Sequence, residues 1–60
     1  MKKIEEEILE SVKEKLFAIM YDLHEIRDYD KRLYTAELLV YEAWMLIKKV
    51  LGEKVVGDEE

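Results

Sequence analysis

The hydrophobic residues between positions 33 and 51, LYTAELLVYEAWMLIKKVL, fall into two stripes on nearly opposite sides of a helical wheel. The broad stripe consists of Leu33, Ala36, Leu39, Val40, Ala43, Trp44, Leu46, Ile47, Val50 and Leu51. The narrow stripe consists of Tyr34, Leu38, Tyr41 and Met45. A helix that is hydrophobic nearly all round is normally buried nearly all round. Because a chain of 60 residues has little else to cover this helix, we expect an assembly.

A first helix is predicted over residues 4–27 by hydrophobic residues that recur at alternating steps of three and four. This heptad series is Leu9, Val12, Leu16, Ile19, Leu23 and Ile26. Such spacing is typical of a helix that packs along one line against another helix. Ile8 and Met20 widen the stripe, and Phe17 and Tyr21 flank it, where they could reach a neighbouring molecule.

The pattern lapses at residues 28–31, where we expect a turn. Continuing the first heptad series would place Asp30 and Glu37 in the core, whereas the second series starts afresh at Leu33. One continuous helix over 4–51 would need a three-residue stammer with a polar core layer. A turn in which Asp28 or Asp30 caps the second helix removes that conflict. We therefore favour an antiparallel two-helix hairpin over a continuous coiled coil.

The second helix is predicted over residues 31–51, and its end is well marked. Lys48 and Lys49 lie in its last turn, where the helix dipole favours cations, and Gly52 follows. Residues 53–60 are predicted to form a flexible acidic tail. The whole chain, 1–60, then makes a single all-α helical-hairpin domain.

Size and composition favour self-association. A core from 60 residues supplies roughly 3–5 kcal/mol, and small domains add disulfides, metals or oligomerisation. The chain has no Cys and one His, which excludes disulfides and the usual zinc sites within one chain. We predict a C2 homodimer that forms a four-helix bundle, with a tetramer or a monomer as alternatives. The predicted interface residues are Phe17, Tyr21, Tyr34, Leu38, Tyr41 and Met45, although the broad stripe could equally face the bundle centre.

Charge and composition narrow the setting in which the protein works. The net charge of −5 argues against binding to nucleic acids or anionic membranes. The acidic residues 5–7 interrupt any signal peptide, and the longest apolar run, 16–21, is too short to span a bilayer. A cytoplasmic protein is therefore expected. Abundant Lys and Glu, with neither Asn nor Gln, are typical of thermostable proteins and of designed ones.

Candidate chemistry is sparse. His24 could pair with Asp28 for acid–base work, and Asp22, Glu25 and Asp28 could form a carboxylate row for a cation such as Mg²⁺. We interpret His24 instead as a histidine at the edge of the apolar stripe, and the carboxylates as a solvated face. The aromatic residues are interpreted as packing and interface residues rather than a ligand pocket. No catalytic residue, metal site or cofactor is predicted.

The sequence thus favours a small structural or interaction protein, not an enzyme, which acts through self-association and a protein partner. Two alternatives from other classes remain open. The first is a metal-binding or metal-dependent helical bundle that uses the acidic residues of the first helix, with His24. The second is a small regulator associated with nucleic acids, which the acidic charge disfavours.

Overall fold

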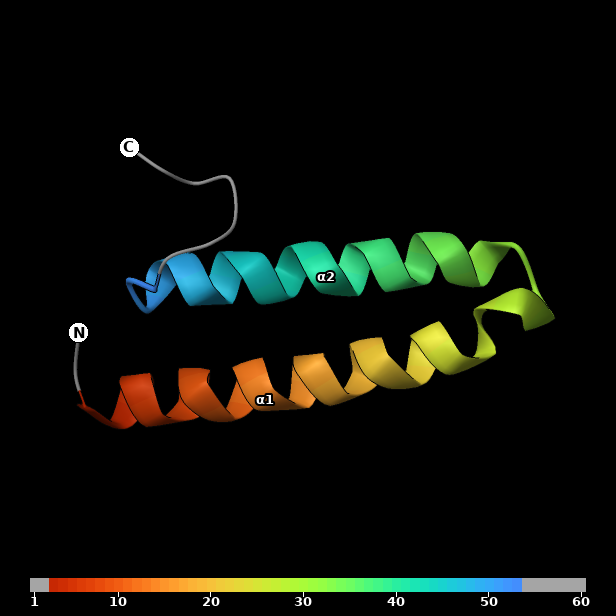
Figure 1. Cartoon of the computed structure of the whole chain (residues 1–60). Helices are drawn as coiled ribbons and strands as arrows, with labels where there is room; N and C mark the ends of the chain where they lie inside the picture. Colours follow the sequence, from red (N-terminus) through yellow and green to blue (C-terminus); the bar gives the residue numbers. More distant parts are fainter. Residues whose placement is uncertain (1–2, 54–60) are drawn as a thin grey trace.

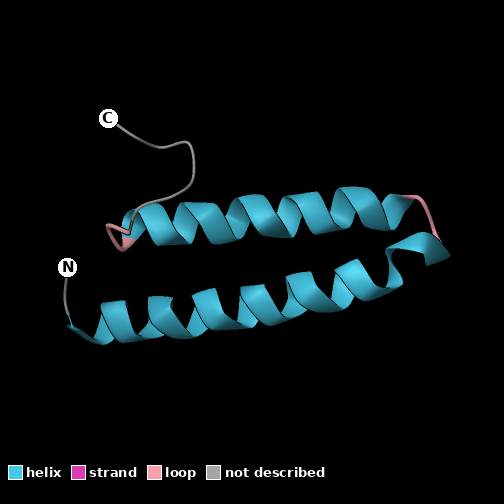
Figure 2. Ribbon diagram, in the orientation of Figure 1, coloured by secondary structure: helices cyan, strands magenta, loops and turns pink. Residues whose placement is uncertain are grey.

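The computed structural model describes residues 3–53. It contains two α-helices, α1 (Lys3–Ile26) and α2 (Arg32–Val50), joined by one turn of 3-10 helix, η1 (Arg27–Tyr29). The helices lie side by side and antiparallel, with the connection at one end of the molecule (Figure 1). Within residues 3–53 there is no strand, and loop is confined to the connection and the end of α2 (Figure 2). The prediction of an all-α, two-helix hairpin is confirmed.

The connection is organised by Asp30, which has an extended backbone. Its Oδ1 accepts a hydrogen bond from the backbone N–H of Arg32 at 2.9 Å. Its two carboxylate oxygens also accept bonds from the Arg32 guanidinium at 3.0 and 2.7 Å, which lowers the pKa of Asp30. Asp30 therefore satisfies a backbone donor in the first turn of α2, as predicted, although Lys31 is the residue directly before the helix. Asp28 has a different role: it accepts a hydrogen bond from the Tyr34 hydroxyl.

The end of α2 forms a Schellman motif. The backbone N–H of Glu53 donates to the carbonyl of Lys48 at 2.9 Å, and that of Gly52 donates to Lys49 at 3.0 Å. Gly52 has a φ of 83°, a left-handed conformation that glycine adopts without a steric penalty. The carbonyl groups of Lys48 and Lys49 are thereby satisfied, and the chain turns back toward α1. The predicted tail lies outside the described residues, apart from Glu53.

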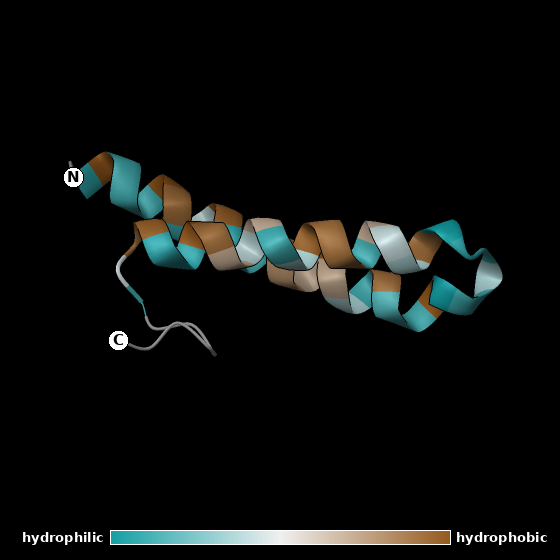
Figure 3. Ribbon diagram, turned by 90° about the horizontal axis from the view of Figure 1, so that it is seen from above, coloured by the Kyte–Doolittle hydropathy of each residue, from teal (hydrophilic) through white to brown (hydrophobic). Residues whose placement is uncertain are grey.

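The two helices meet along a narrow seam rather than around a core. The partly covered apolar side chains of the seam are Leu9, Val12, Leu16, Met20 and Leu23 on α1, and Leu33, Ala36, Val40, Ala43, Trp44, Ile47 and Leu51 on α2. No residue of either helix is buried. The smallest extent of the molecule is 13 Å, about the diameter of one helix, so the hairpin is a single layer. Hydrophobic segments recur along both helices, while the connection is mainly hydrophilic (Figure 3).

The seam uses only part of each predicted stripe. Ile19 and Ile26 belong to the heptad series of the first helix, yet they are 46% and 52% exposed. Leu39, Leu46 and Val50 belong to the broad stripe of the second helix, yet they are 59–62% exposed. One neighbouring helix covers a line of side chains, and these stripes are wider than that line. The broad stripe is therefore only partly covered within the hairpin.

Candidate functional site

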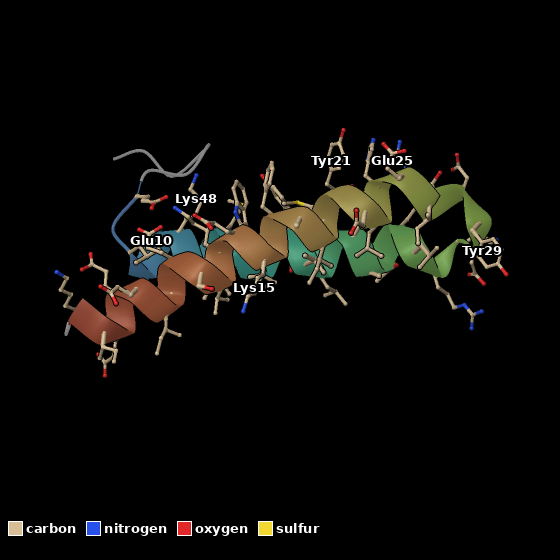
Figure 4. All side chains as sticks on the ribbon, turned by 90° about the horizontal axis from the view of Figure 1, so that it is seen from below. Glu10, Lys15, Tyr21, Glu25, Tyr29 and Lys48 are labelled. Atoms are coloured by element: carbon tan, nitrogen blue, oxygen red, sulfur yellow. The ribbon has the colours of Figure 1, made fainter. Side chains whose placement is uncertain are left out.

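The hairpin has two broad faces with different chemistry, one on each side of the layer of helices. The aromatic face is defined by Phe17, Tyr21, Tyr34, Leu38 and Tyr41, and the aliphatic face by Ile8, Ile19, Ile26, Leu39, Leu46 and Val50. Figure 4 shows that Glu10, Tyr21 and Lys48 project from one side of the layer and that Lys15 projects from the other. The eleven side chains that define the two faces are therefore divided between two opposite surfaces of the layer.

Placement on the two faces follows from helical spacing and from the contacts across the seam. Ile8 and Lys15 are seven residues apart, and Ile19 follows Lys15 by four, so all three share one side of α1. On α2, Glu37 and Tyr41 lie on the aromatic side. Leu39 lies two residues from each of them, and a helix turns about 200° over two residues, so Leu39 points to the opposite side.

Aromatic rings are packed around Trp44 on the aromatic face. The ring centroids of Phe17 and Trp44 are 5.8 Å apart, and those of Tyr41 and Trp44 are 5.9 Å apart, both in tilted arrangements. The Lys48 ammonium lies 4.6 Å from the centroid of the Trp44 ring. Such ring pairs and cation–π contacts stabilise a specific geometry beyond the area that they cover. The Phe17–Trp44 pair holds the middle of α1 against the second half of α2, and the other two contacts orient the indole from within α2.

Near the connection, Glu37 joins the two helices. Its Oε2 lies 3.0 Å from Nδ1 of His24, and its Oε1 lies 3.8 Å from Nη1 of Arg27. The Arg27 guanidinium also lies 5.2 Å from the centroid of the Tyr34 ring. The pairing of His24 with Asp28 considered for acid–base work does not occur, because His24 points across the seam to α2 while Asp28 binds Tyr34. The Asp28 carboxylate raises the pKa of Tyr34 by accepting its hydrogen bond.

At the other end of the aromatic face, Glu53 ties the end of α2 to α1. Its Oε2 accepts a hydrogen bond from Nζ of Lys13 at 2.6 Å, and this bond raises the pKa of Lys13. Its Oε1 lies 4.0 Å from Nζ of Lys48. The Schellman motif at Gly52 directs Glu53 toward α1, so a backbone feature positions this carboxylate.

The aromatic face is hollowed along the seam, but only shallowly. A hollow of about 280 Å³ is lined by Met20, Arg27, Tyr34, Glu37, Leu38 and Tyr41. A smaller one of about 180 Å³ is lined by Phe17, Met20, Tyr21, His24 and Glu37. Five of the six predicted interface residues therefore border this continuous groove. Met45, the sixth, lines a hollow of about 400 Å³ on the outer side of α2, next to Leu38 and Tyr41.

The aliphatic face has a much simpler composition. Its six defining side chains have no polar atoms, and each is 46–62% exposed. Lys15 and, seven residues later, Asp22 lie at its edge on α1, and neither forms an ion pair with another described residue. The ion pairs that link α1 to α2 and to Glu53 are on the aromatic face instead. An apolar surface with unpaired charges at one edge is therefore left uncovered.

The residues considered for metal or acid–base chemistry are not brought together. Among residues 3–53, no group of three or more histidine or carboxylate side chains is arranged to hold a metal ion. The carboxylate row of Asp22, Glu25 and Asp28 is dispersed around the end of α1, and Asp28 is engaged with Tyr34.

Neither described helix is long and apolar enough to cross a membrane.

Comparison with known proteins adds no relative: no family model, no curated protein and no solved structure matches this chain. The two faces are therefore interpreted from their own chemistry.

Sequence reasoning missed two features of these faces. It did not assign Glu37 as the partner of His24 and Arg27, although an antiparallel register that places Phe17 opposite Trp44 also places His24 opposite Glu37. It also treated Ile19 and Ile26 as core residues. The sequence did contain a signal that these two residues would be exposed, because a heptad stripe widened by Ile8 is broader than one neighbouring helix covers.

Proposed function

We propose that this chain is a small structural or interaction protein, without catalysis, that works by associating with itself. The observation that supports the proposal is the absence of any buried residue in either helix, together with 13 large hydrophobic side chains that are 38–89% exposed. Soluble domains normally pack two or more layers of secondary structure around a core. A second hairpin supplies the missing layer.

The energetics favour assembly over an isolated hairpin. Fully burying a Leu, Ile or Val side chain contributes about 1.5–3 kcal/mol, so completing the burial of a half-exposed one contributes about half as much. Six such side chains on each of two copies give a total of about 10 kcal/mol or more, which is comparable to the 4–15 kcal/mol cost of association. Two copies related by a two-fold axis form the simplest closed assembly, a four-helix bundle.

Each face has a reason to take part. The aromatic face includes five of the six predicted interface residues, and Tyr and Trp side chains are common anchors in protein interfaces. The aliphatic face offers the larger number of side chains without polar groups. A dimer that uses one face leaves the other free, so a partner protein could bind to the assembled bundle.

Sedimentation equilibrium at micromolar concentrations tests the proposal. We expect a mass of about twice the 7.2 kDa of the chain, and a thermal unfolding midpoint that rises with protein concentration. A helical protein whose mass stays at 7.2 kDa across the range would contradict self-association. Circular dichroism on the same samples shows whether a monomer, if found, is folded.

A further inference from the structure

We infer that the second copy of the chain docks on the aliphatic face, and that the aromatic face points outward from the dimer. This inference rests on the proposed self-association. It specifies which face of the hairpin forms the interface and where the two-fold axis lies. It differs from the interface predicted from sequence, whose residues lie mainly on the aromatic face. Three observations support it: the polar contacts of the aromatic face, the size of the aliphatic face, and the two unpaired charges at its edge.

The aromatic face already has internal partners for its charged groups. Glu37 is paired with His24 and Arg27, and Glu53 with Lys13 and Lys48, and these pairs lie at the seam. Docking a second copy there would remove water from these ions, and the loss of hydration opposes burial unless new partners replace it. The tyrosine hydroxyl groups of this face would also need new hydrogen-bond partners when water is removed. The aromatic face is thus suited to contact with water or with a polar partner.

The aliphatic face presents enough area for a stable dimer. Ile8, Ile19 and Ile26 on α1 and Leu39, Leu46 and Val50 on α2 are each about half exposed. Six half-exposed aliphatic side chains supply a large share of the roughly 800 Å² that a standard interface buries on each partner. None of these side chains has a polar group that must find a hydrogen bond. Burial of these six side chains therefore removes hydrocarbon from water, and the charged groups affected are Lys15 and Asp22 at the edge of the face.

The charges at the edge fit a two-fold axis. Lys15 and Asp22 are opposite in sign, seven residues apart and unpaired among the described residues. Consider a two-fold axis that lies in the plane of the face, runs at right angles to the helices and crosses α1 midway between Lys15 and Asp22. This axis places Lys15 of each copy beside Asp22 of the other. Two ion pairs then form at the edges of the interface, where charge complementarity fixes register.

The same axis also matches the apolar residues of α2. Because Phe17 lies opposite Trp44 and His24 opposite Glu37, the midpoint between residues 15 and 22 falls opposite the midpoint between residues 39 and 46. The axis therefore stacks Leu39 of each copy on Leu46 of the other. One symmetry operation accounts for the ion pairs on α1 and for the leucine contacts on α2.

A matched pair of variants on α2 tests the face. Leu39→Glu with Leu46→Glu places two charges on the aliphatic face, and Leu38→Glu with Met45→Glu places two charges, at the same spacing, on the outer side of α2 where it borders the aromatic face. By sedimentation equilibrium, we expect the first variant to weaken dimerisation by at least about 100-fold and the second by less than about 10-fold.

The outcomes separate the inference from the proposed function. If the wild-type chain is monomeric, both fail. If the wild-type chain dimerises and the second variant is the one that dissociates, or if both dissociate equally, the aliphatic face is wrong while self-association stands. Selective dissociation of the first variant supports both statements.

A second measurement avoids dependence on the folding of charged variants. The chain has no Cys, so a single introduced Cys is a unique attachment point. Ile19→Cys lies beside the proposed axis, and Phe17→Cys lies on the opposite face of the same helix. With a short bismaleimide, we expect covalent dimers from Ile19→Cys and not from Phe17→Cys. Cross-linking of Phe17→Cys alone would overturn the inference.

Discussion

The aromatic and aliphatic faces come from the same two helices but interact with their surroundings in different ways. On the aromatic face, the Phe17–Trp44 ring pair and the His24–Glu37 ion pair connect α1 to α2, and cation–π contacts add further specific geometry. On the aliphatic face, the hydrocarbon side chains are about half exposed and have no polar group to pair.

One small chain can therefore specify two kinds of contact, directional contacts within the hairpin and hydrocarbon contacts between copies. Directional contacts between particular atoms fix which residues of α1 lie opposite which residues of α2. Hydrocarbon contacts are not directional and contribute in proportion to area, which suits a large surface covered by a second copy. In our proposal the aromatic face sets the register of the hairpin and the aliphatic face provides most of the assembly energy.

The largest effect is expected in the seam that both faces share. Val40→Asp places an unpaired charge between the helices, which we expect to destabilise the fold by about 3 kcal/mol or more and to abolish most helical signal. Circular dichroism and thermal unfolding measure both effects. As a control, Tyr29→Asp replaces a side chain that is 89% exposed and should change stability by less than about 0.5 kcal/mol. Equal losses in both variants would mean that the seam is misplaced.

The second largest effect is expected from reversing a charge at the edge of the aliphatic face. Lys15→Asp brings like charges together across the proposed two-fold axis, and we expect it to weaken dimerisation by about 10-fold. Adding Asp22→Lys restores opposite charges and should restore affinity at low ionic strength, as measured by sedimentation. If the double variant is as weak as Lys15→Asp alone, the proposed pairing of these residues is incorrect.

A smaller effect is expected on the aromatic face. Glu37→Gln keeps the shape of the side chain but removes the charge that His24 and Arg27 share. We expect a loss of about 0.5–1 kcal/mol in the free energy of unfolding, with little change in the dimer dissociation constant. Denaturant titration at fixed concentration measures the first quantity. Glu14→Gln, at an exposed carboxylate without a partner among the described residues, is the control and should have no effect.

The smallest effect is a pH dependence at alkaline pH. Asp28 raises the pKa of Tyr34, so the folded state favours the protonated phenol. This contribution is complete below the unfolded pKa of about 10 and is lost as the pH rises through the higher folded value. We therefore expect the thermal midpoint of the wild type to fall more steeply above about pH 9 than that of Tyr34→Phe. Parallel profiles for the two proteins would contradict the role of this hydrogen bond; Tyr21→Phe is the control.

Much of the fold could be predicted because the signals are local. The conflict in heptad phase at residues 28–31 located the connection, and Asp30 and Gly52 have the backbone roles that their residue types favour. The candidate site was less predictable, since it depends on how far one helix slides along the other. The partner of His24 is set by that register, which helical periodicity within a single helix does not contain.

The exposed Ile19 and Ile26 illustrate a second limit on predicting packing from sequence. A heptad series identifies which residues avoid water, but it does not say whether the covering surface belongs to the same chain. Ile19 and Ile26 satisfy the heptad pattern as well as Leu16 and Leu23 do, yet only the latter pair lies in the seam. The distinction requires the position of α2, which determines the part of the stripe that a single chain can cover.

Trp44 gives the molecule an intrinsic optical reporter. It is the single tryptophan of the chain, and its ring lies beside Phe17, Tyr41 and the Lys48 ammonium. Its fluorescence should therefore respond when α1 separates from α2, because the Phe17 ring then moves away from the indole and water reaches it. Separation of two copies at the aliphatic face should leave its emission nearly unchanged. Emission recorded during dilution and during denaturation would thus distinguish dissociation of the bundle from opening of the hairpin.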